Sequence, residues 1–359
     1  MTGPAPLILH VFPTFAVGGA QIRFAMLANA MGSAFRHQVL SLDGRLDARE
    51  RLLPTVDIAY PELVGAKHAF LASALAYRRL LRAWQPDILM TYNWGAIEFA
   101  YANLLPLVRH IHVIDGFGSD EYFTRLRRRV IANRIALASS TTVVPSLNLR
   151  RILTDEWGLP PERIRYIPNG IDLTRFPVRP RPDDTRPLVI GTVAALRPEK
   201  NIARLIFAFA RLPPPVRLAI VGDGECRTEL TSLAHALSVD DRVDFLGHSN
   251  EIPAHLARFD IFALSSDTEQ MPIVVLEAMA ASLPIVSTDV GDVRLMVAPD
   301  NAALVTRDGI DGLATHLSHL IANPGLRAGL GAANRAKAER DFDQAGMFAA
   351  WQALLEEGA

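Results

Sequence analysis

The chain has 359 residues, half of them hydrophobic, and a formal net charge of −1. This length is too great for one ordinary core and predicts two domains of typical size. The balanced charge argues against a generally nucleic-acid-binding protein, because such a surface needs a basic excess. A single cysteine, Cys226, excludes an intramolecular disulfide and a cysteine-rich metal site, and we interpret it as a small helix residue.

The N-terminus, MTGPAPLILHVFPTF, lacks a charged region followed by a long apolar run. No later stretch offers the ~18 uncharged apolar residues that a membrane-spanning helix needs. We therefore expect a soluble, cytoplasmic protein.

The first half of the chain alternates predicted strands and helices. Leu7–Phe12 is an apolar run of strand length, and a glycine loop and a helical pattern follow it. The other strands expected here are residues 37–42, 56–60, 87–92, 108–114, Thr141–Val144 and 164–167, with a helix at 68–84. Such alternation predicts an α/β fold with a parallel sheet covered on both faces.

Gly18 and Gly19 lie in the loop after the first strand, within the sequence GGAQ. Their backbone amides can approach an anionic group because no Cβ stands in the way. A plain tight turn explains these glycines about as well, since GGAQ is not the G-x-G-x-x-G fingerprint of a dinucleotide site.

His110 and His112 are two residues apart on the strand 108–114 and so share a face, and Asp115 follows at the strand end. Either the acid or a histidine could contact an acceptor, although a lone buried histidine is more often structural. No spacing typical of a metal site accompanies these residues, and we expect no metal.

Residues 122–137 combine arginines with apolar residues at helical spacing. The arginines are Arg125, Arg127, Arg128, Arg129 and Arg134. A basic amphipathic helix can lie on an anionic membrane surface or receive an anionic acceptor. An ordinary solvated helix face is the alternative.

A proline-rich, charged segment at 179–187 is the predicted linker, and it separates domain 1–178 from domain 179–340. The strands expected in the second domain are residues 188–193, 216–221, 242–246, Ile261–Leu264, 284–287 and 302–305, with final helices at 324–340 and 343–355. Ligands bind beyond the carboxyl ends of parallel strands, so we expect the loops of two such domains to face a shared cleft.

Arg197 and Lys200 follow the first strand of the second domain in GTVAALRPEKN. Two cations at a helix start make a good diphosphate clamp. The alternative is a solvated helix start in which Glu199 partly neutralises both charges. Gly222, in VGDG after the next strand, indicates a turn and could also permit close approach of a nucleotide.

Segment 265–290 carries two acids eight residues apart. We place Glu269 in a loop, Pro272 at the first position of a helix, and Glu277 within that helix. A helix N-terminus attracts anions, and carboxylates accept hydrogen bonds from hydroxyls. The segment therefore predicts a ligand that bears both phosphate and sugar.

Together these motifs resemble the family-4 (group 1) retaining glycosyltransferases of GT-B fold. The resemblance covers nearly the whole chain. It is carried by GGAQ, residues 144–176 with IPNGID, GTVAALRPEKN, VGDG, and the two acids with EAMAASLPIVSTDVG. It implies two Rossmann-like doubly wound domains facing across a cleft, with the C-terminal helix, 341–359, packed back on the first domain.

The resemblance also implies roles for individual residues. Glu277 would hold the ribose, Glu269 the donor sugar, and Arg197 with Lys200 the diphosphate. Other expected substrate contacts are Gly18, Gly19, Gly222, Gln270, Met271, Pro272, Ile273 and Val274. Catalytic roles fall to Glu269, Arg197, Lys200 and Asp115.

The sequence departs from the family pattern in three ways. Gln270 stands where the family usually has glycine, and Ser282-Leu283 replaces a small residue and glycine. Many members have a histidine at the strand end of the first domain, where Asp115 is the nearest equivalent and His112 its rival.

The function expected from the resemblance is retaining transfer of a hexose-type sugar from a UDP- or GDP-sugar, without a metal or other cofactor. The acceptor would be a hydroxyl of a saccharide or lipid-linked saccharide in bacterial polysaccharide or lipopolysaccharide synthesis, with anionic membrane contact through Arg125–Arg134. The alternatives are a non-hydrolysing nucleotide-sugar epimerase and a non-catalytic sugar-binding protein. An NAD-dependent dehydrogenase is a weaker alternative, because this sequence lacks the dinucleotide fingerprint.

Overall fold

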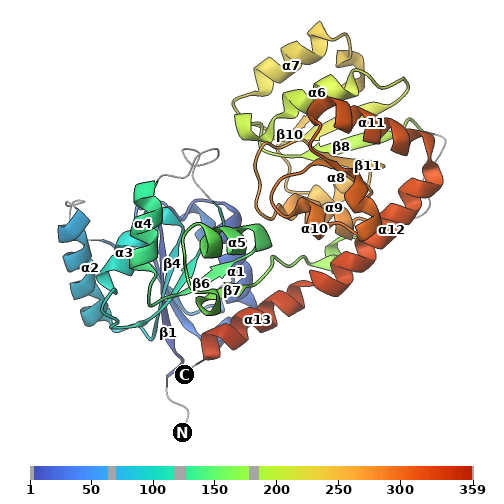
Figure 1. Ribbon diagram of the computed structural model, residues 1–359. Helices are drawn as coiled ribbons and strands as arrows, with labels where there is room; N and C mark the ends of the chain where they lie inside the picture. The colour runs from blue at the N-terminus through green and yellow to red at the C-terminus, as the bar shows by residue number, and fades with distance from the viewer. Residues whose placement is uncertain (1–3, 64–69, 117–126, 178–185, 358–359) are drawn as a thin grey trace. The chain divides into compact units, whose positions relative to one another are not determined.

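The computed structural model describes residues 4–63, 70–116, 127–177 and 186–357 (Figure 1). The chain divides into two compact units. Unit 1 comprises Met1–Pro168 with Phe348–Ala359, and unit 2 comprises Asn169–Met347. Most of the expected linker at 179–187 lies outside the described residues.

The first unit contains a seven-stranded sheet in the order β3-β2-β1-β4-β5-β6-β7, with all pairs parallel. Its strands are β1 (Leu7–Phe12), β2 (Arg36–Ser41), β3 (Ile58–Ala59), β4 (Ile88–Tyr92), β5 (Arg109–Val113), β6 (Thr141–Val144) and β7 (Ile164–Tyr166). Its helices include α1 (Gly19–Met31), α2 (Phe70–Trp84), α3 (Ile97–Ala102), α4 (Arg127–Ala136) and α5 (Leu147–Asp155). Each strand expected in this half is present, with ends that differ by a few residues.

The second unit contains a six-stranded parallel sheet in the order β10-β9-β8-β11-β12-β13. Its strands are β8 (Val189–Val193), β9 (Arg217–Val221), β10 (Val243–Gly247), β11 (Ile261–Leu264), β12 (Ile285–Thr288) and β13 (Val305–Thr306). Its helices are α6 (Ile202–Phe209), α7 (Arg227–Ala236), α8 (Ile252–Leu256), α9 (Ile273–Ala280), α10 (Val293–Met296), α11 (Gly309–Ala322), α12 (Pro324–Asp341) and the first part of α13 (Gln344–Glu356).

The strand expected at residues 302–305 is wrong for most of its length, because Pro299–Leu304 form a 3₁₀ helix and only Val305 enters the sheet. The buried side chain of Asn301 accepts from Ile285 N at 2.9 Å and donates to Ile285 O at 2.6 Å. The side-chain amide of Asn301 thus takes the place of a neighbouring strand, because it bonds to both backbone groups of Ile285 in β12.

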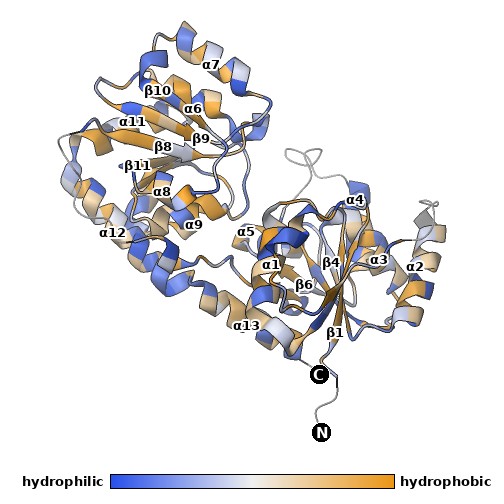
Figure 2. Cartoon of the chain, turned by 180° about the vertical axis from the view of Figure 1, so that it is seen from behind, coloured by the Kyte–Doolittle hydropathy of each residue, from blue (hydrophilic) through white to orange (hydrophobic). Residues whose placement is uncertain are grey.

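Burial explains why these segments became strands and helices. The central strands are buried on both faces and form the cores of their units, and Figure 2 shows much of their length as hydrophobic. On α6, Ile202, Leu205, Ile206 and Phe209 recur at helical spacing and are buried against the sheet.

Both sheets follow the order 3-2-1-4-5-6 of a doubly wound fold, with one strand added in unit 1. The direction of winding reverses between β1 and β4 in the first unit, and between β8 and β11 in the second. Doubly wound sheets bind ligands at the carboxyl ends of the strands at this switch point. Each unit therefore has one preferred binding edge.

The chain leaves unit 1 at Pro168, so most of the IPNGID sequence belongs to the second unit. Ile171 forms a parallel bridge with Asp343, and Asn169 N donates to the sulfur of Met271 at 3.3 Å. The chain returns to unit 1 within α13. Arg109 of β5 donates to the carbonyl oxygens of Leu354 and Leu355, which have no partner within the helix at its C-terminal end.

Acid should unfold unit 1 through its buried histidines. Burial lowers the pKa of His37 to about 4 and of His110 to about 3, and it lowers the pKa values of His10 and His112 as well. These groups stay neutral in the folded state while the unfolded chain takes up protons, so stability falls as pH drops below about 6.5.

All four tryptophans lie in unit 1, so their fluorescence reports the unfolding of that unit alone. We expect the urea midpoint measured by tryptophan fluorescence to fall between pH 7 and pH 4.5. Unchanged midpoints over this range would contradict the assignment of neutral buried histidines.

Candidate functional site

The switch point of unit 2 brings together two of the residues singled out in the sequence. Lys200 lies in the loop after β8 and Glu269 in the loop after β11, and these strands are neighbours. Lys200 Nζ lies 2.6 Å from Glu269 Oε1, which also accepts from Ser266 Oγ at 2.8 Å. Both side chains are largely buried, with exposures of 25% and 11%. A cation and a carboxylate thus share one point at the binding edge.

Arg197 lies at the N-cap of the 3₁₀ turn that carries Lys200, with its side chain exposed. Among the residues that the structure describes, its guanidinium has no hydrogen bond or ion pair. It is therefore available for an anionic ligand, whereas Lys200 already neutralises an acid.

Polar contacts join the loop after β8 to the loop after β11. Asn201 takes a left-handed conformation, with φ 43°, and caps α6 by accepting from Arg204 N. Asp267 in the facing loop accepts from Asn201 Nδ2 at 3.1 Å and from Arg204 Nη2 at 2.6 Å. Ser265 Oγ donates to the carbonyl oxygen of Lys200 at 3.1 Å. These bonds fix the positions of Lys200 and Glu269 without using either of their charges.

The start of α9 differs from the prediction by one position. Pro272 is the N-cap residue, with ψ 118°, and the helix begins at Ile273. A proline N-cap supplies no side-chain acceptor, so the amides of Ile273 and Val274 remain for a ligand. Gly291, with φ 51°, lies so close to the carbonyl oxygen of Gln270 that a Cβ there would stand 2.4 Å from it. The loop before α9 is therefore packed tightly against backbone.

Glu277 lies within α9, as predicted, and is partly buried. Burial raises its pKa to about 7, while the positive charge of Arg175 acts in the opposite direction. A carboxyl group that is half-ionised near neutrality responds strongly to a hydrogen-bonding ligand.

Position 222 needs a glycine, because its backbone lies against the backbone of the neighbouring loop. Its φ is 139°, and a Cβ at this position would stand 1.8 Å from the carbonyl oxygen of Ala194, in the loop after β8. The residue thus lets the loops after β8 and β9 lie side by side.

In unit 1, Gly18 is the N-cap of α1 and Gly19 is its first residue, directly after β1. Gly19 is exposed, and a Cβ there would meet nothing within 4 Å among the described residues. Gln21 holds the loop by donating from Nε2 to the carbonyl oxygen of Thr14 at 2.8 Å. This arrangement is compatible with an anion bound at the start of α1, and equally with a simple turn.

Asp115 follows β5 near the same edge. Its side chain is 22% exposed and pairs with Arg23 of α1, whose Nη1 lies 2.5 Å from Oδ1 and whose Nη2 donates to Oδ2 at 2.9 Å. The amide of Asp115 donates to Asn93 Oδ1 at 2.9 Å. Sequence reasoning missed Arg23 and Asn93. One pattern in the sequence could have indicated Arg23: it follows Gly19 by four residues, a spacing that places both on one face of a helix.

His110 and His112 share a face, as their spacing predicted, because both contact Thr91 Oγ1, at 2.8 and 2.6 Å. His112 is 1% exposed, and burial lowers its pKa well below the ordinary value. Its ring is buried, so the geometry suits Asp115 better than His112 for contact with an acceptor.

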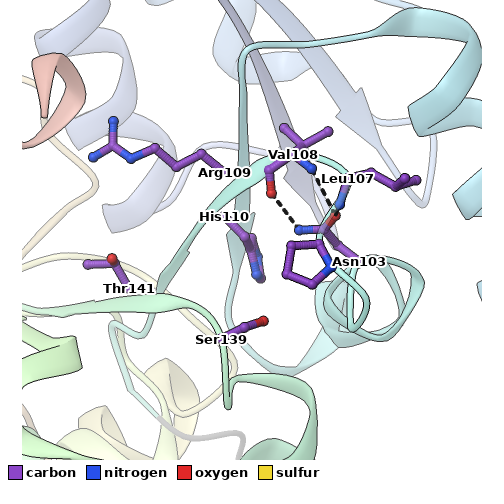
Figure 3. A pocket seen from close by; sticks show the side chains of 8 residues that line it. Asn103, Leu107, Val108, Arg109, His110, Ser139 and Thr141 are labelled. Atoms are coloured by element: carbon purple, nitrogen blue, oxygen red, sulfur yellow. Dashed lines mark hydrogen bonds between the residues drawn. The ribbon is translucent and has the colours of Figure 1, made fainter. Parts of the chain in front are cut away.

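A pocket of about 300 Å³ opens at the opposite edge of this sheet, at the amino ends of β5 and β6 (Figure 3). Three of its polar side chains, Asn103, Arg109 and His110, have partners within the protein. Asn103 bonds to the backbone of Leu107 and Val108, Arg109 to α13, and His110 to Ser140 Oγ at 2.6 Å. The pocket is separate from the switch point.

Within residues 4–63, 70–116, 127–177 and 186–357, no cluster of three metal-ligating side chains is found. In the same ranges, every helix is too short or too polar to cross a bilayer.

Two Rossmann-like parallel sheets in one chain form the GT-B fold, which solved glycosyltransferases share. Residues 17–175 match the family model Glycosyltransferase Family 4, and residues 178–337 match the model Glycosyl transferases group 1. The chain therefore belongs to the family-4, group 1 glycosyltransferases.

Two of the relatives are named for glycogen or lipopolysaccharide synthesis. A glycogen synthase of Mycobacterium tuberculosis is 29% identical over 292 residues, which cover 77% of this chain and 70% of the relative. The lipopolysaccharide core biosynthesis glycosyltransferase LpsE of Rhizobium meliloti is 27% identical over 317 residues, 87% of this chain and 88% of the relative. The crystal structure of Anabaena Alr3699/HepE in complex with UDP has a TM-score of 0.82 at 18% identity and covers 98% of this chain and 99% of that one.

Proposed function

We propose that this glycosyltransferase moves a hexose-type sugar from a UDP- or GDP-sugar to a hydroxyl of a saccharide or lipid-linked saccharide, with retention at the anomeric carbon. The observation that carries the proposal is the Lys200–Glu269 pair at the switch point of unit 2. It joins a cation suited to a phosphate to a carboxylate suited to sugar hydroxyls. The solved structure of Alr3699/HepE with UDP supports a nucleotide-linked donor.

In the proposed reaction, unit 2 stabilises the leaving diphosphate. Arg197 and Lys200 supply positive charge, and the amides of Ile273 and Val274 supply hydrogen bonds. Glu277 holds the ribose and Glu269 the hydroxyls of the donor sugar. Attack occurs on the face that the phosphate leaves, so the departing phosphate oxygen accepts the proton of the acceptor hydroxyl, and no protein nucleophile is needed.

A panel of nucleotide sugars, read by release of nucleoside diphosphate with and without saccharide acceptors, tests this function. We expect acceptor-dependent release from one donor, with unchanged rates in EDTA because protein cations neutralise the leaving group. Conversion of the donor into a new sugar epimer without acceptor would identify an epimerase instead. A strict requirement for a divalent metal would overturn the metal-free mechanism.

We further propose that the enzyme works at the inner face of a membrane, through α4. Arg127, Arg128 and Arg134 are exposed on this helix, together with Ile131 and Ile135, which are 60% and 47% exposed. Cationic and apolar side chains on one exposed face suit an anionic lipid surface. Arg125 of the predicted segment lies outside the described residues.

Flotation with vesicles tests the α4 surface. The wild-type protein should float with phosphatidylglycerol vesicles and not with pure phosphatidylcholine, and the variant Ile131→Ser/Ile135→Ser should stay at the bottom. Leu295→Ser is the control, because Leu295 is a comparably exposed apolar residue, at 56%, in unit 2. Equal flotation of the α4 variant and wild type would refute this surface.

A further inference from the structure

The α1 helix supplies a buried arginine that no role in the proposed transfer yet uses. Arg23 is 7% exposed, yet it lies one turn after Gly19 at the binding edge of unit 1. Burying a guanidinium is costly unless an anion and hydrogen bonds compensate. Asp115 provides the anion, and its charge raises the pKa of Arg23 against the opposing effect of burial.

Arg23 Nη2 donates to Oδ2 of Asp115 at 2.9 Å, and Nη1 lies 2.5 Å from Oδ1, a buried atom that accepts no hydrogen bond from the described residues. Together these two contacts fix the plane of the carboxylate as well as its position. The backbone of Asp115 is fixed separately by Asn93, which follows β4. Helix α1, the β4 exit and the β5 exit therefore converge on one residue, Asp115.

Arg23 is itself held from the far side. Its guanidinium carbon lies 6.0 Å from the ring centroid of Trp351 of α13, which is 2% exposed, and Tyr92 lies close enough to interact with it electrostatically. Tyr92 Oη is in turn 3.0 Å from His10 Nδ1. The arginine sits in a packed pocket and cannot swing toward solvent.

We infer that Arg23 is a positioning residue, which holds the Asp115 carboxylate so that its remaining lone pairs accept a hydrogen bond from a substrate hydroxyl. A carboxylate has about four acceptor sites, and the one hydrogen bond from Arg23 Nη2 to Oδ2 occupies a single site. The Asp115 side chain retains 22% exposure, whereas that of Arg23 has 8%. This inference rests on the proposed transfer, because it assigns Asp115 to a hydroxyl of the transferred or receiving sugar.

The test compares Arg23→Met and Arg23→Lys with Asp115→Asn and with the double variant Arg23→Met/Asp115→Asn. We expect Arg23→Met and Asp115→Asn each to lower kcat about 100-fold, since a displacement near 1 Å can cost that much. The double variant should be no slower than either single variant, and Arg23→Lys should fall between. Nucleoside diphosphate affinity should stay unchanged, because its binding groups lie in unit 2.

Arg186 and Asp260 offer a matched control, since they form a two-point pair in unit 2, at 2.9 Å for both contacts, away from the switch point. Arg186→Met should lower stability without lowering kcat. Guanidinium chloride at low concentration should restore part of the activity of Arg23→Ala and none in Arg23→Ala/Asp115→Asn.

Two outcomes would overturn the inference. One is full activity of Asp115→Asn, and the other is additive losses in the double variant. Loss of transfer in Lys200→Ala, measured beside them, would show that the proposed function stands even when the role of Arg23 does not.

Discussion

Lys200→Ala should lower kcat/KM for the nucleotide sugar by about 10²- to 10³-fold, the range seen when one donor to a developing negative charge is removed. Lys200 is held in place by Glu269 and lies at the switch point, so its charge is oriented before the donor arrives. An ammonium has three donors, so Lys200 can keep Glu269 and still bind a phosphate oxygen. Lys200→Arg should retain part of the activity, because the charge stays while its geometry changes.

The control for this variant is Lys337→Ala. Lys337 also forms an ion pair, with Asp341 at 3.1 Å, but on α12 and away from the switch point. The Lys337→Ala variant should have the same kcat/KM for the nucleotide sugar as the wild-type enzyme. Since removing Lys200 leaves Glu269 partly buried without its cation, each variant needs a thermal melt. Wild-type kcat/KM in folded Lys200→Ala would exclude the diphosphate clamp.

Glu277→Gln should weaken binding of the nucleoside diphosphate about 10- to 100-fold, the cost of replacing a charged acceptor by a neutral one. The pKa of Glu277 is raised to about 7 by burial, and ribose hydroxyls bind its ionised form best. Wild-type affinity should therefore fall about tenfold for each pH unit well below 7. The glutamine variant should lose this dependence, because it has no proton to release.

The same substitution should stabilise the free protein. A folded-state pKa raised from 4.5 to about 7 means that the stability contributed by Glu277 is lost as pH rises through this window. The shift corresponds to about 3 kcal/mol above pH 7, and glutamine removes the cost of the buried charge. Calorimetry of binding at pH 6, 7 and 8, with urea unfolding at the same pH values, measures both effects. A pH-independent affinity in wild type would count against Glu277 as the ribose ligand.

Local patterns in the sequence predicted the elements that carry the site. Apolar runs bounded by glycine or proline marked nearly every strand, because parallel strands are buried on both faces. The same patterns placed Glu269 in a loop and Glu277 in a helix, as the structure confirms. They failed at residues 302–305, where the side chain of Asn301 replaces a strand partner. Sequence alone cannot show that substitution.

The sequence by itself determined the order of strands and helices and the residue types at the strand ends, since each depends on neighbours within a few positions. The tertiary structure alone decided which strand ends meet. Lys200 reaches Glu269 across 69 residues, and Arg23 reaches Asp115 across 92. Such pairs depend on strand order, which is set by non-local packing of side chains between elements, so periodicity carries no record of them.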